Sequence, residues 1–149
     1  MRDRIDAALK EAMKAGEKRR TATFRLVSAA IKDRDIAARA LGRDRIADSE
    51  ILDVLAKMIK QRDESARLYE EGGRVDLAEQ EREEITIIRE FLPSQMCADD
   101  VKNCCQQVIA DIGAQGLRDM GKTMNALKER YPGQMDFAKA SGVVKELLK

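Results

Sequence analysis

The segment at residues 116–123 has the most specific chemistry in the sequence. It reads Gly-Leu-Arg-Asp-Met-Gly-Lys-Thr and matches the phosphate-binding loop of nucleotide-binding proteins letter for letter. In that loop, backbone amides and the lysine bind the phosphates, and the threonine hydroxyl binds magnesium. Such a loop follows a buried strand, whereas residues 101–112 have the apolar spacing of a helix. We therefore expect the segment to be helical, with Asp119 capping the helix, and not to bind nucleotide.

The cysteines are the other reactive side chains. The chain has three cysteines and no histidine, so a usual zinc ligand set cannot be completed. Cys104 and Cys105 lie on the apolar stripe of a predicted helix, where cysteine acts as a small hydrophobic residue. Histidine is also the usual general base at neutral pH. We therefore expect no metal, no cofactor and no catalytic residue.

Basic residues on the second predicted helix are spaced at intervals of seven. They are Lys18, Arg25, Lys32 and Arg39. Seven residues make nearly two helical turns, so these side chains form one stripe that could follow a phosphate backbone. Residues 1–45 contain thirteen basic and seven acidic residues, a net charge of +6, and acidic helices follow. The acidic helices neutralise this charge, or the basic half meets an anionic partner.

A second group of basic residues lies in the last third of the chain. The tail candidates for phosphate contacts are Arg118, Lys122, Lys128 and Lys139. Aromatic residues make up only 3% of the sequence, so binding of single strands by base stacking is not expected. Both groups therefore predict contacts with a phosphate backbone, and the alternative is a solvated charged surface.

Apolar residues recur at spacings of three and four along most of the chain, as in helices. They predict four helices in the first part, over residues 3–15, 17–41, 48–71 and 77–92. Ile5, Leu9 and Met13 should face the core from the first helix, and Asp48 or Ser49 should cap the third. Three shorter helices are predicted over residues 101–112, 120–131 and 137–148.

Composition supports an all-α fold. The chain is 37% charged and has two prolines and no tryptophan, and strong helix formers dominate it. Pro93 cannot continue a helix, so we predict a long-helix N-terminal module of about four helices over residues 1–92. A small helical C-terminal module of about three helices should follow over residues 93–149. No apolar stretch is long enough to span a membrane, and the first residues resemble no signal or transit peptide, so a cytoplasmic location is expected.

Several linked motifs follow one another along nearly the whole chain. They are KQRDES at 60–65, YEEGGRVDL at 69–77, EEI at 83–85, EFLP at 90–93 and DMGK at 119–122. Together and in this order they resemble the GatB/YqeY family, and specifically YqeY-like proteins. That family is similar to the C-terminal tail of the B subunit of the amidotransferase that acts on Asp-tRNA(Asn) and Glu-tRNA(Gln).

The resemblance implies a free-standing version of a tRNA-binding appendage. Our first hypothesis is a non-catalytic helical adaptor that binds tRNA, the amidotransferase or other translation-related proteins. A second hypothesis, also from the resemblance, is a carbon-nitrogen ligase with glutamine as amide donor, although the sequence contains no matching set of active-site residues. A protein-binding helical scaffold without a role in RNA binding is the third.

Overall fold

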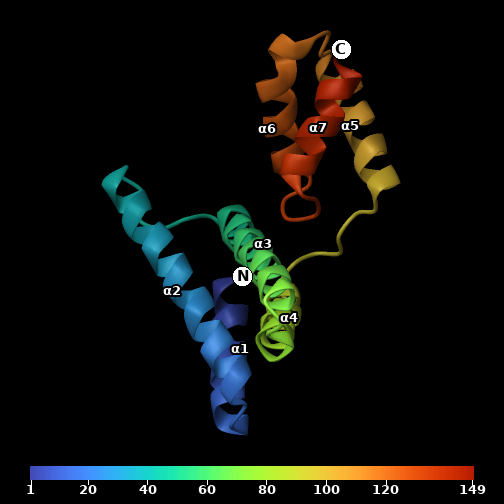
Figure 1. Cartoon of the computed structure of the whole chain (residues 1–149). Helices are drawn as coiled ribbons and strands as arrows, with labels where there is room; N and C mark the ends of the chain where they lie inside the picture. Colours follow the sequence, from blue (N-terminus) through green and yellow to red (C-terminus); the bar gives the residue numbers. More distant parts are fainter. The chain divides into compact units, whose positions relative to one another are not determined.

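The chain folds into seven α-helices and one short 3₁₀ turn, and it has no strands. These elements come from a computed structural model that describes all residues, 1–149 (Figure 1). The all-α prediction is confirmed. Contacts within the chain divide it into two compact units, Met1–Leu92 and Pro93–Lys149. None of the helices combines the length and the apolar character needed to cross a membrane.

The N-terminal unit contains four helices, among them the two longest of the chain. They are α1 (Arg2–Ala15), α2 (Lys18–Ala40), α3 (Asp48–Glu71) and α4 (Val75–Arg89). Gly16 ends α1 with a left-handed backbone (φ 70°), which glycine adopts without steric cost and which lets α2 start two residues later. The core is formed mainly by the inner faces of α2, α3 and α4, with Phe24, Leu55 and Ile88 fully buried.

An aromatic pair closes this core where α4 ends. The rings of Phe24 and Phe91 lie edge to face, with 5.4 Å between their centroids. This geometry places the positive edge of one ring against the negative face of the other. The guanidinium of Arg4 lies 5.6 Å from the centroid of the Phe91 ring, so α1 contacts the same pair. The residues that follow α4 therefore belong to the core of the N-terminal unit.

Two details of these helices differ from the sequence prediction. Met13 is 52% exposed, while Ala12 is 1% exposed, so the inner face of α1 follows Ile5, Leu9 and Ala12. The methyl group of alanine lets α1 approach α2 closely, which a methionine would prevent. Ala47 precedes the first residue of α3, and the Glu50 carboxylate accepts a hydrogen bond from its amide at 2.8 Å. Neither Asp48 nor Ser49 caps this helix.

Two ion pairs with little exposure hold the helices of the N-terminal unit together. Asp35 of α2 accepts hydrogen bonds from both Arg2 terminal nitrogens, at 2.7 and 2.8 Å, and from the Ile46 amide at 2.9 Å. The Arg2 Nη2 also donates to the Ile46 carbonyl at 3.0 Å. Arg62 of α3 donates from Nε to Glu84 of α4 at 2.9 Å. The first pair ties α1 and the α2–α3 loop to α2, and the second joins α3 to α4.

The C-terminal unit is a three-helix bundle with its own core. Its helices are α5 (Ala98–Ile112), α6 (Met120–Arg130) and α7 (Phe137–Leu147), and η1 (Leu117–Asp119) leads into α6. Cys105, Val108, Leu127 and Val144 are fully buried in it. The Gln95 side-chain Nε2 donates to the Gly133 carbonyl at 2.7 Å, and the Met96 backbone amide donates to the Gln134 carbonyl at 2.9 Å. These bonds hold the start of the unit against the α6–α7 loop.

Candidate nucleic-acid interface

The segment that matches a phosphate-binding loop is helical. Residues 117–119 form η1, and Gly121, Lys122 and Thr123 lie in the first turns of α6. Thr123 is fully buried, and its hydroxyl donates to the Asp119 carbonyl at 2.9 Å, so it is not available to a magnesium ion. The Asp119 carboxylate accepts from the Gln115 amide at 3.0 Å and from no amide of α6. Asp119 therefore stabilises the turn before α6 and does not cap the helix with its side chain.

The cysteines occupy three different environments. Cys105 is fully buried in the core, and burial raises the pKa of its thiol. Cys104 is half-buried beside it, with its sulfur 3.8 Å from the sulfur of Met96. Cys97 is exposed, and its thiol donates to the Asp100 carboxylate at 3.1 Å. The predicted packing role is confirmed for Cys104 and Cys105, and no three His, Cys, Asp or Glu side chains gather as a metal-binding group.

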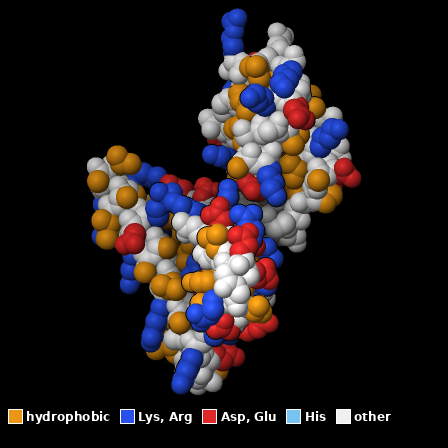
Figure 2. Space-filling model, in the orientation of Figure 1, with side chains coloured by type: hydrophobic (Ala, Val, Ile, Leu, Met, Phe, Trp, Pro, Cys, Tyr) orange, Lys and Arg blue, Asp and Glu red, His pale blue; other side chains and the backbone are white.

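The predicted tail residues are all exposed. Arg118 lies on η1, Lys122 and Lys128 lie on α6, and Lys139 lies on α7. None of these four forms an ion pair, whereas Arg130 at the end of α6 pairs with Asp111 of α5. Figure 2 shows the basic side chains of this unit as separate blue patches among apolar and neutral side chains, with a few acidic ones in red. The structure thus presents these charges to solvent without acidic partners.

Helices α6 and α7 carry lysine at equivalent positions. The third residue of each helix is a lysine, Lys122 and Lys139, and the ninth is also a lysine, Lys128 and Lys145. All four side chains are exposed, and α6 and α7 pack against each other and against α5. The sequence contains this repetition, but it becomes visible only once the two helix starts are known.

The predicted stripe on α2 is also exposed along its length. Lys18, Arg25 and Lys32 form no ion pair, and Arg39 donates from Nε to the Asp44 carbonyl at 3.2 Å. The acidic helices neutralise other arginines of the basic half. The pairs are Arg19–Glu83, Arg20–Glu90 and Arg43–Glu50, in addition to the buried Arg2–Asp35 pair. The acidic residues therefore neutralise part of the basic half, but none of them forms an ion pair with a residue of the stripe.

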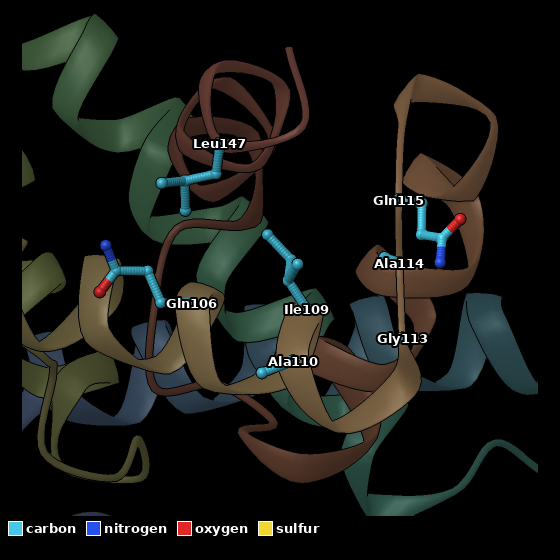
Figure 3. A pocket seen from close by; sticks show the side chains of 7 residues that line it. All are labelled: Gln106, Ile109, Ala110, Gly113, Ala114, Gln115 and Leu147. Carbon is cyan, nitrogen blue, oxygen red and sulfur yellow. The ribbon is translucent and has the colours of Figure 1, made fainter.

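A hollow of about 410 Å³ lies at the carboxyl end of α5, and sequence reasoning did not identify it. Ile109 of α5 and Leu147 of α7 line its middle, with Gln106 and Gln115 to either side (Figure 3). All seven lining residues are uncharged, so the hollow offers hydrogen bonds from amides but no acid or base. Its residues come from two segments, residues 106–115 and Leu147, and no sequence spacing signals such a site.

Two proteins with curated names are similar to this chain. Each is named altered inheritance of mitochondria protein 41, mitochondrial, one from Clavispora lusitaniae and one from Lachancea thermotolerans. The first is 37% identical over 92 residues, which are 62% of this chain and 51% of that protein. The second is 36% identical over 84 residues, which are 56% of this chain and 43% of that protein. The chain thus spans about half the length of these relatives.

The relatives contradict the expected location. Both are mitochondrial proteins by name, so the prediction of a cytoplasmic protein is wrong. That prediction rested on the residues at the start of this sequence. Because the match spans only about half of each relative, those residues carried no information about a targeting segment.

The family model of YqeY-like proteins matches residues 2–148. This range includes every helix of both units, so the match covers the whole fold and not only the segment that mimics a phosphate-binding loop. The resemblance seen in the sequence motifs is confirmed, and the chain belongs to the YqeY-like protein family.

Proposed function

We propose that this protein is a non-catalytic helical adaptor whose C-terminal unit binds tRNA by contacts with phosphates. The observation that carries the proposal is the set of exposed cations on η1, α6 and α7 that lack acidic partners. The resemblance of the tail to a tRNA-binding region of an amidotransferase subunit supports the same reading. The amidotransferase itself and other translation-related proteins are the further partners that this resemblance implies.

Unpaired lysines favour an anionic polymer for a simple electrostatic reason. A lysine already bonded to a carboxylate must lose that bond before it binds phosphate, whereas Lys122, Lys128 and Lys139 are free to bind. Binding releases counterions from the RNA, so affinity should fall steeply with salt. The Tyr131 and Phe137 rings are partly buried against the core of the C-terminal unit, so base stacking is not the expected mode of binding. Contacts with phosphates and helix shape would then dominate, with weak sequence discrimination.

The test is a titration of labelled, unmodified tRNA at several potassium chloride concentrations. We expect a linear fall of log affinity with log salt, with a slope of roughly −3 if four phosphates are contacted. The double variant Lys122→Glu/Lys128→Glu should bind more than tenfold more weakly than the wild type. Lys102→Glu is the matched control, because Lys102 is an exposed lysine on α5 of the same unit. Absence of binding at low salt, or equal losses in both variants, would refute the proposal.

The second basic group, on α2, stays a weaker prediction for RNA contact. Lys18, Arg25, Lys32 and Arg39 form no ion pair, but they border exposed apolar side chains that a phosphate backbone does not use. The variant Arg25→Glu/Lys32→Glu, measured in the same titration, decides whether this stripe contributes. A loss as large as that of the α6 variant would place both groups on the RNA.

The glutamine-dependent carbon-nitrogen ligase remains the alternative from an enzyme class. Pure protein can be incubated with Glu-tRNA(Gln), glutamine, ATP and magnesium, and the esterified amino acid analysed by mass spectrometry. Formation of Gln-tRNA(Gln) would overturn the non-catalytic part of the proposal. Unchanged Glu-tRNA(Gln) is the expected result.

A further inference from the structure

Helix α2 has a second apolar stripe on the face that points away from the core. Its members are spaced alternately by four and three residues: Ala22, Leu26, Ala29, Asp33, Ile36 and Ala40. All six are exposed, and Leu26 and Ile36 are 51% and 62% exposed. An alternation of four and three is the pattern of a coiled-coil seam. We call this set the outer seam.

The inner face of α2 is formed by different residues. Phe24, Val27 and Ile31 are buried in the core of the N-terminal unit, where α1, α3 and α4 contact α2. Figure 1 shows the carboxyl-terminal half of α2 extending past α1. Figure 2 shows orange side chains beside blue ones at this far end of α2. The helix therefore buries one apolar face and leaves the outer seam uncovered.

The basic stripe has a fixed position relative to the outer seam. When Leu26 takes heptad position a and Ala29 takes position d, all four basic residues of the stripe take position g. In coiled coils, residues at e and g flank the seam and form salt bridges with the partner helix. The opposite edge, position e, is occupied by Thr23, Ala30 and Ala37 and carries no charge.

We propose that the outer seam of α2 binds an amphipathic helix of a partner protein, with acidic residues along the edge that faces the basic stripe. Charge complementarity carries the choice of partner, because the stripe offers four cations at the positions that pair across such an interface. This surface lies on the N-terminal unit, so the inference is independent of the tRNA proposal.

A second copy of the chain does not fit this surface. In an antiparallel pair, the g edges of the two α2 helices would meet and bring the basic stripes of the two copies against each other. In a parallel pair, each g edge would meet the uncharged e edge, and the cations would gain no partner. RNA fits less well than an acidic helix, since phosphates would use the cations and leave Leu26 and Ile36 exposed.

The residues of the outer seam also indicate which side chains the partner helix should carry. Three of the six residues of the outer seam are alanines, and such small side chains allow the axes of two helices to approach closely. Asp33 occupies position a in the middle of the seam and would be costly to bury against apolar groups. A partner with an amide or basic side chain opposite Asp33 would satisfy it and fix the register.

The probe for the experiment is a labelled helical peptide of three heptads. It carries Leu and Ala at the seam positions, one central Asn to face Asp33, and Glu at every e and g position. A control peptide has Lys in place of every Glu. Like charges along the edges keep each peptide from pairing with itself. Fluorescence anisotropy measures binding to the full-length protein.

We expect the Glu peptide to bind and the Lys peptide not to bind. Leu26→Glu/Ile36→Glu should weaken binding of the Glu peptide at least tenfold. Arg25→Glu/Lys32→Glu should weaken binding of the Glu peptide roughly tenfold. The same variant should bind the Lys peptide, because its new glutamates at positions 25 and 32 can pair with lysines of that peptide. All four substituted residues are exposed, and unchanged circular dichroism would show that the variants are folded.

Three results would overturn the proposal. The first is failure of the Glu peptide to bind, or equal binding of both peptides. The second is a wild-type dimer in sedimentation experiments that Leu26→Glu/Ile36→Glu dissociates, which would identify a second copy as the occupant. The third is a loss of tRNA affinity in the same seam variant, which would assign the surface to RNA.

Discussion

Replacing Asp35 by asparagine tests the electrostatic argument for the N-terminal unit most directly. The Asp35 carboxylate accepts hydrogen bonds from Arg2 and from the Ile46 amide, and these partners lower its pKa from 3.8 to about 2. Both side chains of the pair are shielded, with 24% exposure for Arg2 and 12% for Asp35. Asn keeps the shape and a carbonyl acceptor but removes the charge.

The magnitude follows from the pKa. A difference between 3.8 and about 2, at ~1.4 kcal/mol per pH unit, corresponds to about 2.5 kcal/mol of folding stability at pH 7. The folded-state pKa lies below the unfolded one, so the carboxylate stabilises the fold above pH 3.8 and this stabilisation is lost as the pH falls toward 2. Asp35→Asn should therefore lower the free energy of unfolding by about 2.5 kcal/mol at pH 7 and by much less near pH 2.

The assay needs a signal from the N-terminal unit alone. The chain has two tyrosines, Tyr69 in α3 and Tyr131 in the C-terminal unit, and no tryptophan. In a Tyr131→Phe background, Tyr69 fluorescence during urea denaturation reports on the N-terminal unit. The difference in free energy of unfolding between the variant and this background, measured from pH 7 to pH 2.5, gives the effect of Asp35.

Glu50→Gln is the matched control. Glu50 also pairs with an arginine and accepts one backbone amide, and the hydrogen bond from Arg43 lowers its pKa to about 2. The side chains of that pair are 49% and 36% exposed, so water should reduce its contribution to well under about 1 kcal/mol. A loss in Asp35→Asn that does not depend on pH, or equal losses in the two variants, would refute the argument from burial.

Three further predictions use the same equipment. Glu84→Leu leaves Arg62 buried without its partner and should cost about 3 kcal/mol, while Arg62→Leu/Glu84→Leu should recover much of that loss in urea denaturation; an equally unstable double variant would contradict this. Phe91→Leu removes the edge-to-face contact with Phe24 and should lower the free energy of unfolding by roughly 1 kcal/mol or slightly more, whereas an unchanged value would mean that the ring pair contributes nothing. A thiol reagent, followed by mass spectrometry, should modify Cys97 in the native protein but Cys105 only after unfolding, and early modification of Cys105 would show that the C-terminal core opens readily.

The sequence predicted the helices well because their apolar residues recur at helical spacing. Every predicted helix is present, and most bounds differ by one or two residues. The errors concern choices between neighbouring residues. Ala12 and not Met13 faces the core, because the distance between α1 and α2 decides that choice and the spacing does not contain it.

The contacts made over long sequence separations could not be predicted. Asp35 is one of the seven acidic residues counted in residues 1–45, and nothing in the sequence distinguishes it from the others, yet it is buried against Arg2, which lies 33 residues earlier. The outer seam was also missed. Helix α2 has apolar residues on two faces, and only the packing shows that Leu26 and Ile36 stay exposed on the second face. Exposure of the basic candidates agrees with the prediction, but exposure alone does not test what they bind.

Gly121 offers a way to separate the needs of the fold from those of a ligand. It lies within α6 and is exposed, and a methyl group added there would meet no atom within 4 Å. Alanine at this position should make the C-terminal unit more stable by up to about 1 kcal/mol. The fold therefore gains nothing from a glycine beside Lys122. If Gly121→Ala stabilises the protein and weakens tRNA binding, the absence of a side chain at this position allows RNA to approach the backbone closely. Glycine would then improve binding there at the expense of stability.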